Sequence, residues 1–446
     1  MKINNVCIIG MGFIGTTLAA VMAEAGFTIF GIEKNKEKLE QLEQGKPHFF
    51  EEDLPEILSR QIGKNLHLFD KIPGDKKIDA FVIAVATPVD KDTKVPNLEY
   101  VKNAIEDILP YLEENQLVIL RSTVPVGVAR NFVLPILQKK VKNVHLSFCP
   151  ERTVEGKALK ELKTLPQIIG ALNERSMDLS VDLFSRITPS IVKTSSLEVA
   201  EIIKLINNSY RDFIFAYANQ VALICKNLGL DAKEVIDSAN FGYPRSNVQQ
   251  PGFVGGLKPG FVGGVCLEKD PYILINCSGI DGGLIKAARE INEGIIKHVA
   301  ERVEDYIKEK NLSPNETKIF ISGLAFKGNP ATDDLRGSPA VQLLVYLKSA
   351  QMEKIYGHDF VVEEQEIENL GIKPCLMEEG LKDADVAIFM NNHKNYQELD
   401  IERLAKTMKP DALLFDGWQL FDDKLKSMEY INYESIGYKK KKNRLA

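Results

Sequence analysis

The feature that most constrains the fold is a glycine-rich turn near the amino terminus. An apolar run at 5–10 leads into Gly10, Gly12 and Gly15, and good helix formers follow at 16–25. Strand, tight turn and helix in this order are typical of a dinucleotide-binding βαβ unit. Gly10 permits the turn, Gly12 lets the backbone approach a pyrophosphate, and Gly15 allows close helix packing. The sequence therefore predicts a phosphate site at the helix amino end.

The next apolar run, 27–32, ends at the acidic residue Glu33, about twenty residues after the turn. A carboxylate in this place accepts hydrogen bonds from an adenosine ribose and repels a 2′-phosphate, which favours NAD over NADP. The neighbouring Lys34 weakens this preference slightly.

Two further apolar runs end in hydroxyl side chains. The run 80–86 leads to Thr87, and the run 117–120 leads to Ser122 and Thr123. Strands that alternate with helical segments form a parallel sheet, in which ligands bind at the carboxyl ends of the strands. We expect Thr87, Ser122 and Thr123 to border the cofactor.

The rest of the chain divides into a helical region and a second α/β unit. Apolar residues recur at helical spacing from 197 to 228 with no Gly or Pro, which predicts one long buried helix, and a second helical region covers 284–310. A new strand at 318–322 opens another α/β unit, with further strands expected at 354–356, 386–390 and 412–415. The predicted class is α/β: two Rossmann-like, doubly wound parallel-sheet domains joined by a long central helix and a helical dimerisation region. The expected boundaries are 1–196, 197–312, 313–437 and a disordered basic tail at 438–446.

Composition excludes several functions. The 56 Lys and Arg against 62 Asp and Glu leave a net charge of −6, so no global positive field attracts nucleic acid. The six cysteines form no CxxC pair, which argues against a metal cluster or a disulfide framework. The chain shows no signal peptide and no apolar run long enough for a membrane span, and we expect a cytosolic protein.

One cysteine stands out by its neighbours. Cys266 lies in GGVCLEKD, where Gly263 and Gly264 leave room for a ligand and Lys269 and Asp270 follow closely. A reactive thiolate needs a nearby positive charge or base. The alternative is a buried cysteine that packs as a small hydrophobe. Spacing alone does not decide between the two.

Other polar residues also allow two interpretations. Lys204 and Asn208 are one turn apart on the long helix, so both point to the same side. They could act as a pair that stabilises an oxyanion. Alternatively, the Lys204 side chain extends its ammonium into water. Glu151 and Glu155 in CPERTVEG are either solvated loop carboxylates or include a general base.

Taken together, these segments resemble the nucleotide-sugar 6-dehydrogenase family, the relatives of UDP-glucose dehydrogenase, over about residues 1–425. The resemblance rests on motifs in the family's order: GMGFIG at 10–15, ATP at 86–88, STVPVG at 122–127, CPERTVEG at 149–156, EIIKLINNSYRD at 201–212, GGVCLEKD at 263–270, GLAFKG at 323–328 and TDDLRGSPA at 332–340.

The resemblance implies a four-electron oxidation of a sugar C6 alcohol to a carboxylate with two NAD+. Cys266 would capture the aldehyde as a thiohemiacetal and then hold a thioester. Lys204 and Asn208 would stabilise the oxygen as it gains negative charge. Glu151, with Thr123 and Asp270 positioning water, would assist proton transfer and hydrolysis. The remaining residues implied in binding are Phe13 and Ile14 for the cofactor and Arg152, Glu155, Arg211, Arg245, Gly263, Lys327 and Arg336 for the substrate.

The resemblance also makes 313–437 a UDP-binding domain and implies a homodimer in which Arg245 reaches the neighbouring subunit's substrate. The CPER form at 149–152 resembles the motif of enzymes that act on UDP-N-acetylhexosamines, especially UDP-N-acetylmannosamine. Glu155 instead resembles the residue that the UDP-glucose enzymes carry in this motif. An N-acetylhexosamine is the favoured substrate and UDP-glucose the alternative.

The chain departs from the family in two places near the expected site. PGFVGG occurs twice, at 251–256 and 259–264, and spacing does not tell which copy borders the substrate. Trp418 stands where many relatives carry an arginine, which removes one cation. Two rival functions remain: a two-electron β-hydroxyacid dehydrogenase without a cysteine nucleophile, and a non-catalytic nucleotide-sugar sensor in which the duplication has displaced Cys266.

Overall fold

The computed structural model describes residues 2–241 and 259–439. The chain divides into two compact units, one made of Met1–Asn208 and Lys269–Asp281, the other of Ser209–Glu268 and Gly282–Ala446. The boundary passes through two helices, α8 (Leu197–Leu228) and α10 (Val265–Ser278), so each of them has residues in both units.

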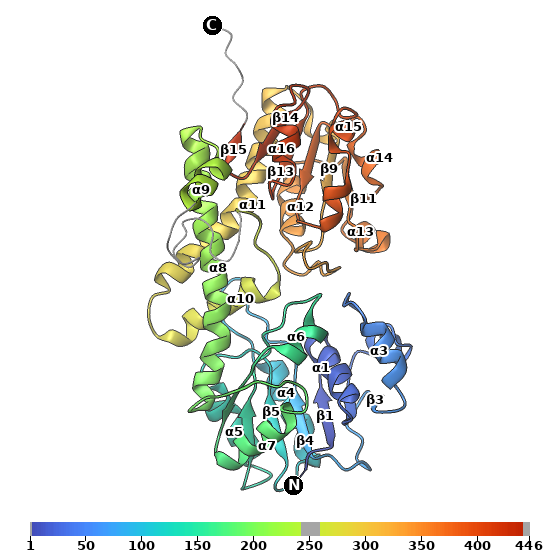
Figure 1. Ribbon diagram of the computed structural model, residues 1–446, viewed down its shortest axis with the longest axis vertical. Helices are drawn as coiled ribbons and strands as arrows, with labels where there is room; N and C mark the ends of the chain where they lie inside the picture. The colour runs from blue at the N-terminus through green and yellow to red at the C-terminus, as the bar shows by residue number, and fades with distance from the viewer. Residues whose placement is uncertain (1, 242–258, 440–446) are drawn as a thin grey trace. The chain divides into compact units, whose positions relative to one another are not determined.

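The first unit is built on an eight-stranded sheet with helices around it (Figure 1). Its strand order is β3-β2-β1-β4-β5-β6-β7-β8, and every neighbouring pair is parallel except β6 and β7. The strands are β1 (Asn5–Ile9), β2 (Thr28–Ile32), β3 (Leu66–Phe69), β4 (Ala80–Ile83), β5 (Leu117–Leu120), β6 (His145–Phe148), β7 (Gln167–Ala171) and β8 (Ile191–Lys193). The helices are α1 (Phe13–Glu24), α2 (Lys36–Glu43), α3 (Leu54–Gln61), α4 (Glu99–Ile108), α5 (Leu134–Leu137), α6 (Ala158–Thr164) and α7 (Glu174–Phe184).

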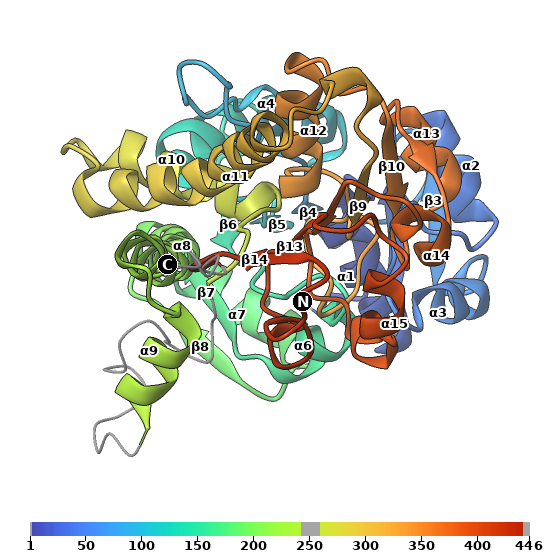
Figure 2. The same ribbon diagram turned by 90° about the horizontal axis from the view of Figure 1, so that it is seen from above.

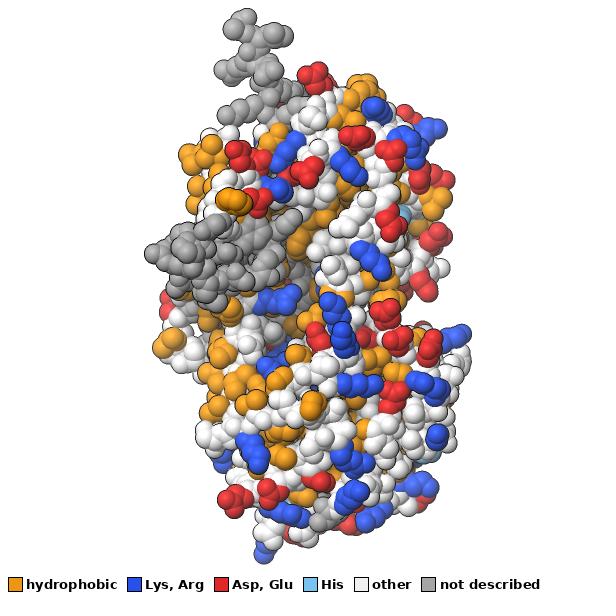
Figure 3. All heavy atoms as spheres, viewed as in Figure 1, with side chains coloured by type: hydrophobic (Ala, Val, Ile, Leu, Met, Phe, Trp, Pro, Cys, Tyr) orange, Lys and Arg blue, Asp and Glu red, His pale blue; other side chains and the backbone are white. Residues whose placement is uncertain are grey.

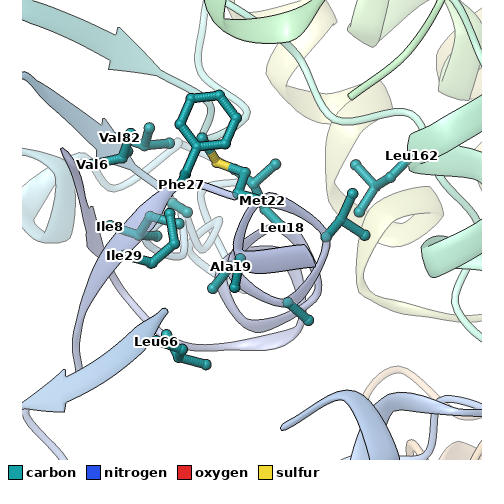
Figure 4. Packing of buried hydrophobic residues seen from close by; sticks show 14 of the residues in the cluster. Val6, Ile8, Leu18, Ala19, Met22, Phe27, Ile29, Leu66, Val82 and Leu162 are labelled. Atoms are coloured by element: carbon teal, nitrogen blue, oxygen red, sulfur yellow. The ribbon is translucent and has the colours of Figure 1, made fainter. Parts of the chain in front are cut away.

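The core of this unit packs helix α1, which follows the glycine-rich turn, against the sheet. Helix α1 buries Leu18 and Met22 against side chains of the sheet, among them Ile8 and Ile29, and all four are 0% exposed (Figure 4). Burial of a large aliphatic side chain stabilises a fold by roughly 1.5–3 kcal/mol. The start of α1 is therefore held against the end of β1 by packing along the whole helix.

The second unit repeats the plan with a seven-stranded sheet. Its order is β11-β10-β9-β12-β13-β14-β15, parallel except for β14 with β15. Helices α11 and α12 lie side by side in both views (Figures 1 and 2). The strands are β9 (Ile319–Ser322), β10 (Ile355–His358), β11 (Lys373–Pro374), β12 (Val386–Phe389), β13 (Leu413–Asp416), β14 (Asn432–Ser435) and β15 (Tyr438–Lys439). The helices are α9 (Ala232–Asn240), α11 (Gly283–Glu309), α12 (Pro339–Ser349), α13 (Glu364–Asn369), α14 (Met377–Leu381), α15 (Ile401–Ala405) and α16 (Asp422–Leu425).

The predicted fold class is confirmed, and the long helix has the predicted bounds, 197–228. Helix α10 is an element that the sequence did not reveal, because it contains Pro271, and proline inside a helix removes a backbone hydrogen bond. Strand β15 extends the second sheet two residues into the segment assigned to the tail, 438–446. None of the helices in 2–241 or 259–439 is long and apolar enough to span a bilayer.

Candidate functional site

The glycine-rich turn joins β1 to α1. A Cβ on Gly15 would overlap the carbonyl oxygen of Gly10, so this close packing of helix on turn requires glycine. A Cβ on Gly12 would meet no atom within 4 Å, which leaves the backbone there open to a ligand. Phe13 and Ile14, in the first turn of α1, are half-buried. This turn fits the pyrophosphate of a dinucleotide, because the N–H groups of a helix amino end attract negative charge.

The acidic residue expected at the ribose lies directly after β2. One oxygen of Glu33 accepts the backbone N–H of Asn35 at 2.9 Å. The adjacent Lys34 ammonium lies 2.5 Å from the carboxylate of Asp107. This ion pair offsets the positive charge that would otherwise favour a 2′-phosphate, so the local charge is consistent with NAD.

The structure brings together the three hydroxyl residues predicted at the carboxyl ends of β4 and β5. The Thr87 hydroxyl donates to the carbonyl of Thr123 at 2.5 Å, and the Ser122 hydroxyl donates to the carbonyl of Val85 at 2.7 Å. Thr87 and Ser122 are buried. These hydrogen bonds connect the segments that follow β4 and β5. Direct contact of the hydroxyls with the cofactor stays a prediction.

A buried carboxylate that the sequence analysis did not single out holds the segment after β5. Glu201, on α8, accepts the N–H of Gly127 at 2.6 Å and that of Ala129 at 2.8 Å, one with each oxygen. Burial raises the pKa of Glu201 to about 7, although both N–H groups act in the opposite direction. The available signal was an acidic residue at a position that the helical period places among buried apolar residues.

Glu151 is buried and ion-paired, so a solvated loop carboxylate is the wrong interpretation for it. Its carboxylate pairs with Arg121, which also donates to the carbonyl of Cys149 at 3.0 Å, and it accepts the N–H of Thr153 at 2.8 Å. Burial alone would raise the pKa of Glu151, but Arg121, the Thr153 N–H and the charge of Lys204 together hold it below its ordinary value. The ion pair and the backbone N–H therefore favour the ionised form of this buried carboxylate.

The long helix and α10 meet within the first unit through a buried carboxylate. Asp270 is 0% exposed and accepts from the side-chain amide of Asn208 at 2.5 Å and from the ammonium of Lys269 at 2.7 Å. An asparagine amide carries two N–H donors, so one more can serve a ligand oxygen. Lys204 is 9% exposed, so its side chain does not extend into water.

Exposure distinguishes Cys266 from most of the other cysteines. It is exposed in the first turn of α10, whereas burial raises the pKa of the Cys149 thiol to about 12 and that of Cys375 to about 11. Burial also raises the pKa values of Cys7 and Cys225. A thiol at a helix amino end is favoured as the thiolate. Cys266 therefore has the surroundings of a reactive cysteine.

The second copy of PGFVGG, 259–264, is the one that leads into this turn. Gly264 has a φ of +90°, and its N–H donates to the carbonyl of Gly337 at 2.9 Å. A Cβ on Gly264 would lie 2.7 Å from the Phe326 ring, and a Cβ on Gly263 would overlap Pro339. The turn is therefore seated on the GLAFKG and DLRGSPA segments. The first copy lies outside the described residues.

The cations expected at the nucleotide lie on the same two segments. The Lys327 ammonium lies 5.2 Å from the centre of the Phe326 ring, and Arg336 pairs with Asp334 at 2.6 Å. Trp418 follows β13 and donates its indole N–H to the carbonyl of Met390 at 3.1 Å. On the face shown in Figure 3, basic and acidic side chains are interspersed, in keeping with the small net charge.

The remaining predicted substrate residues differ in their surroundings. Arg152 donates to the carbonyl of Pro166 at 2.5 Å, Glu155 is half-buried, and Arg211 is exposed on α8. Arg245 lies outside the described residues.

The catalytic candidates fall into two groups. The first unit brings together Lys204 with Glu151, and Asn208 with Asp270. Cys266 belongs to the second unit, but it is four residues before Asp270 on the same helix, about one turn. Within the first unit the described residues thus group a buried ammonium, an amide and two carboxylates, a set of the kind that stabilises developing negative charge.

Replacing Glu201 by Gln should change how stability depends on pH. The folded-state pKa of about 7 lies above the ordinary 4.5, so the folded protein holds this proton more tightly than the unfolded chain does. The stability that the protonated Glu201 contributes is therefore lost as the pH rises from 4.5 to about 7. The lost stability is about 3 kcal/mol. The thermal midpoint of the wild type should fall relative to Glu201→Gln between pH 4.5 and 7.

Glu198→Gln is the matched control, because its hydrogen bond to Arg130 lowers the pKa of Glu198 to about 2. The contribution of Glu198 to the free energy of unfolding changes only below pH 4.5, where its carboxylate takes up a proton. A difference between wild type and Glu201→Gln that stays constant across pH 4.5–7 would contradict the assignment.

Comparison with known proteins gives the family. Three domains of the UDP-glucose/GDP-mannose dehydrogenase family match consecutive parts of the chain: the NAD binding domain at 4–188, the central domain at 198–294 and the UDP binding domain at 320–423. The UDP-N-acetyl-D-mannosamine dehydrogenase of Campylobacter jejuni is 30% identical over 423 residues, 91% of this chain and 99% of that protein. The NDP-N-acetyl-D-galactosaminuronic acid dehydrogenase of Ralstonia nicotianae is 30% identical over 92% of this chain and 95% of its own length.

A solved structure agrees. That of the UDP-D-ManNAc dehydrogenase from Pyrococcus horikoshii matches with a TM-score of 0.84 and 27% identity, over 98% of this chain and 100% of that one. The match covers both sheets and the long helix between them in sequence. The chain therefore belongs to the UDP-glucose/GDP-mannose dehydrogenase family and is an NAD-dependent UDP-sugar dehydrogenase.

Proposed function

We propose that this enzyme oxidises the C6 hydroxyl of a UDP-N-acetylhexosamine, UDP-N-acetylmannosamine above all, to the uronate through a covalent intermediate on Cys266. The observation that carries the proposal is the exposed Cys266 in the first turn of α10, one turn before the buried Asp270. A four-electron oxidation that releases no aldehyde requires a covalent bond between the enzyme and the intermediate, and a thiolate can form that bond.

The turn of Gly10, Gly12 and Gly15 would hold NAD+, which would supply the two-electron oxidant for each of two successive oxidations at C6. Between them, the Cys266 thiolate adds to the C6 aldehyde and forms a thiohemiacetal. The second oxidation leaves a thioester, which water cleaves to the carboxylate and the regenerated thiol. The sum is two NAD+ reduced for each alcohol oxidised.

The buried polar residues divide the remaining roles. Lys204 and the second N–H of Asn208 stabilise the oxygen as negative charge develops on it. Glu151 is paired with Arg121 and, with Thr123 and Asp270, orients the hydrolytic water. Because the pKa of Glu151 is lowered, it is a weaker base than an ordinary glutamate.

The substrate residues are proposed on the resemblance. Lys327 and Arg336 bind the diphosphate, and Arg152, Glu155, Arg211 and Gly263 border the sugar and its neighbours. The CPER motif and the names of the relatives favour an N-acetylated sugar. The family assignment argues against the two-electron β-hydroxyacid dehydrogenase, and the seated turn before Cys266 argues against a sensor with a displaced cysteine.

We also propose a functional division at 1–196, 197–312 and 313–437, for NAD binding, the central helical region and UDP binding. The three family matches fall within these ranges. A cytosolic location suits the mechanism, because the nucleophilic thiol must stay reduced.

Replacing Cys266 by Ser should abolish the covalent route. With UDP-N-acetylmannosamine and NAD+, the wild type should form two NADH for each uronate, and Cys266→Ser should lower kcat at least about a hundredfold because the thiolate is lost. Absorbance of NADH and mass spectrometry of the product measure both. Cys277→Ser, on the same helix, is the matched control and should keep wild-type kcat. One NADH with released aldehyde in the wild type, or full activity in Cys266→Ser, would contradict the mechanism.

A panel of UDP-sugars tests the substrate. We expect kcat/KM for UDP-N-acetylmannosamine to exceed that for UDP-glucose, UDP-N-acetylglucosamine and UDP-N-acetylgalactosamine by about tenfold or more, because a buried hydrogen bond to the acetamido group or an epimeric hydroxyl is lost with each alternative. NADH absorbance is the readout. A preference for UDP-glucose would overturn the sugar while leaving the cysteine mechanism in place.

We propose that the enzyme is a homodimer formed through α8. Apolar side chains remain exposed at Val199, Ile202, Ile206, Tyr210, Tyr217 and Ile224. Their spacing of 3, 4, 4, 7 and 7 residues places them along one face of the helix. A continuous apolar face of this kind is typical of a protein interface. Arg245 of each subunit would then reach the other subunit's substrate.

A charge on this face should break the dimer. Ile224→Glu should halve the molar mass seen by light scattering and lower activity, because burial of an unpaired carboxylate at an interface is unfavourable. Tyr100→Glu, a substitution at an equally exposed residue on α4, is the matched control and should leave the mass unchanged. A wild-type protein that is monomeric at micromolar concentration would contradict the proposal.

A further inference from the structure

Helix α10 contains a backbone carbonyl that the helix itself does not satisfy. In an α-helix the carbonyl of Leu267 would accept the N–H of residue 271. Residue 271 is a proline, which has no N–H. Leu267 directly follows Cys266, so the missing bond lies in the turn that carries the thiol.

A buried arginine supplies the missing donor. Nη1 of Arg289, on α11, donates to the Leu267 carbonyl at 3.0 Å and to the carboxylate of Asp212, on α8, at 2.6 Å. Arg289 is 1% exposed and Asp212 is 0% exposed. One guanidinium nitrogen carries two N–H groups, so it makes both bonds at once. The carboxylate orients the arginine, and the arginine holds the turn.

The same polar network reaches the other side of the cysteine. The Asn292 amide donates to the backbone carbonyl and the carboxylate of Asp212, at 3.0 and 2.9 Å, and accepts from Asn219 at 3.0 Å. The Asn219 side chain then makes two bonds with the backbone of Gly260, at 2.9 and 3.0 Å. The chain is thus anchored at Gly260, before Cys266, and at Leu267, after it.

We infer that Arg289, oriented by Asp212, is a positioning residue that keeps the first turn of α10 formed and so aims the Cys266 thiol. The inference rests on the proposed function in taking Cys266 as the nucleophile. Arg289 touches neither substrate nor cofactor in this role. It acts through a backbone carbonyl that Pro271 leaves available.

A purely structural role for Arg289 predicts a different result. An arginine that only neutralises Asp212 would affect stability and leave the reactivity of Cys266 unchanged. An arginine that acts through the Leu267 carbonyl would affect the thiol, and a new donor at residue 271 would compensate for its loss. Pro271→Ala supplies that donor, because alanine restores the N–H.

The test uses Arg289→Gln combined with Asp212→Asn, which removes the charge pair without leaving a buried unpaired carboxylate. We expect kcat to fall about tenfold or more with KM for the UDP-sugar within about twofold, because a misplaced reacting group lowers the chemical step. Alkylation of Cys266 at pH 7, followed by peptide mass spectrometry, should slow about two- to fivefold as the helix end that favours the thiolate is lost. Addition of Pro271→Ala should restore most of both.

The matched control is Arg302→Gln with Glu434→Gln. Arg302 is a second buried arginine on α11, and it pairs with Glu434 at 2.8 Å. This variant should keep the wild-type alkylation rate and kcat. An equal loss in this control, unchanged kcat and alkylation in the Arg289 variant, or no recovery on adding Pro271→Ala would each overturn the inference.

Arg289→Lys keeps a buried cation beside Asp212 and covers the case in which the double variant does not fold. It should also lose kcat and alkylation rate, because a single ammonium on a shorter side chain does not reproduce both bonds. A wild-type result for Arg289→Lys would overturn the role of the guanidinium. Failure of the proposed function is separate: it would show as full activity in Cys266→Ser, whereas the alkylation rates test the Arg289 contact whether or not Cys266 is the nucleophile.

Discussion

Parallel strand pairing is the constraint on which the rest of the structure depends. In each unit the central strands are parallel, so their carboxyl ends meet at one edge. The loops that carry six of the eight family motifs leave from such an edge, and the other two motifs belong to α8 and α10. In the first unit the glycine-rich turn follows β1, Glu33 follows β2 and Ser122 follows β5 by two residues. A motif placed at the amino end of any of these strands would lie on the opposite side of the sheet.

Buried charges then hold the loops in place. Arg121 pairs with Glu151, and Arg289 pairs with Asp212. Removing one partner from such a pair leaves a charge that neither water nor an opposite charge stabilises, so each pair sets one geometry strongly. The chain uses them beside its reactive segments, where a loop held only by apolar contacts could adopt several arrangements.

In the proposed mechanism, the position of the Cys266 thiol depends on the backbone that supports it. Cys266 is exposed in the first turn of a helix that a proline weakens four residues beyond Leu267. The turn is supported on one side by Gly264 against Gly337 and on the other by Arg289. Both supports come from segments far away in sequence, so they form only when the second unit folds.

The sequence by itself determined the features that depend on local patterns: the glycine-rich turn, the long helix at 197–228, the strand 117–120 and the motifs that name the family. Periodicity and local propensity decide such elements within a few residues. Tertiary structure alone decided three other matters: that α10 forms despite Pro271, that Gly264 of the second PGFVGG copy is seated against Gly337, and that Glu151 pairs with the buried Arg121. Each of these depends on partners more than twenty residues away. Burial and buried hydrogen bonds arise only when distant segments pack together, and a single sequence carries no local signal of which polar groups will meet.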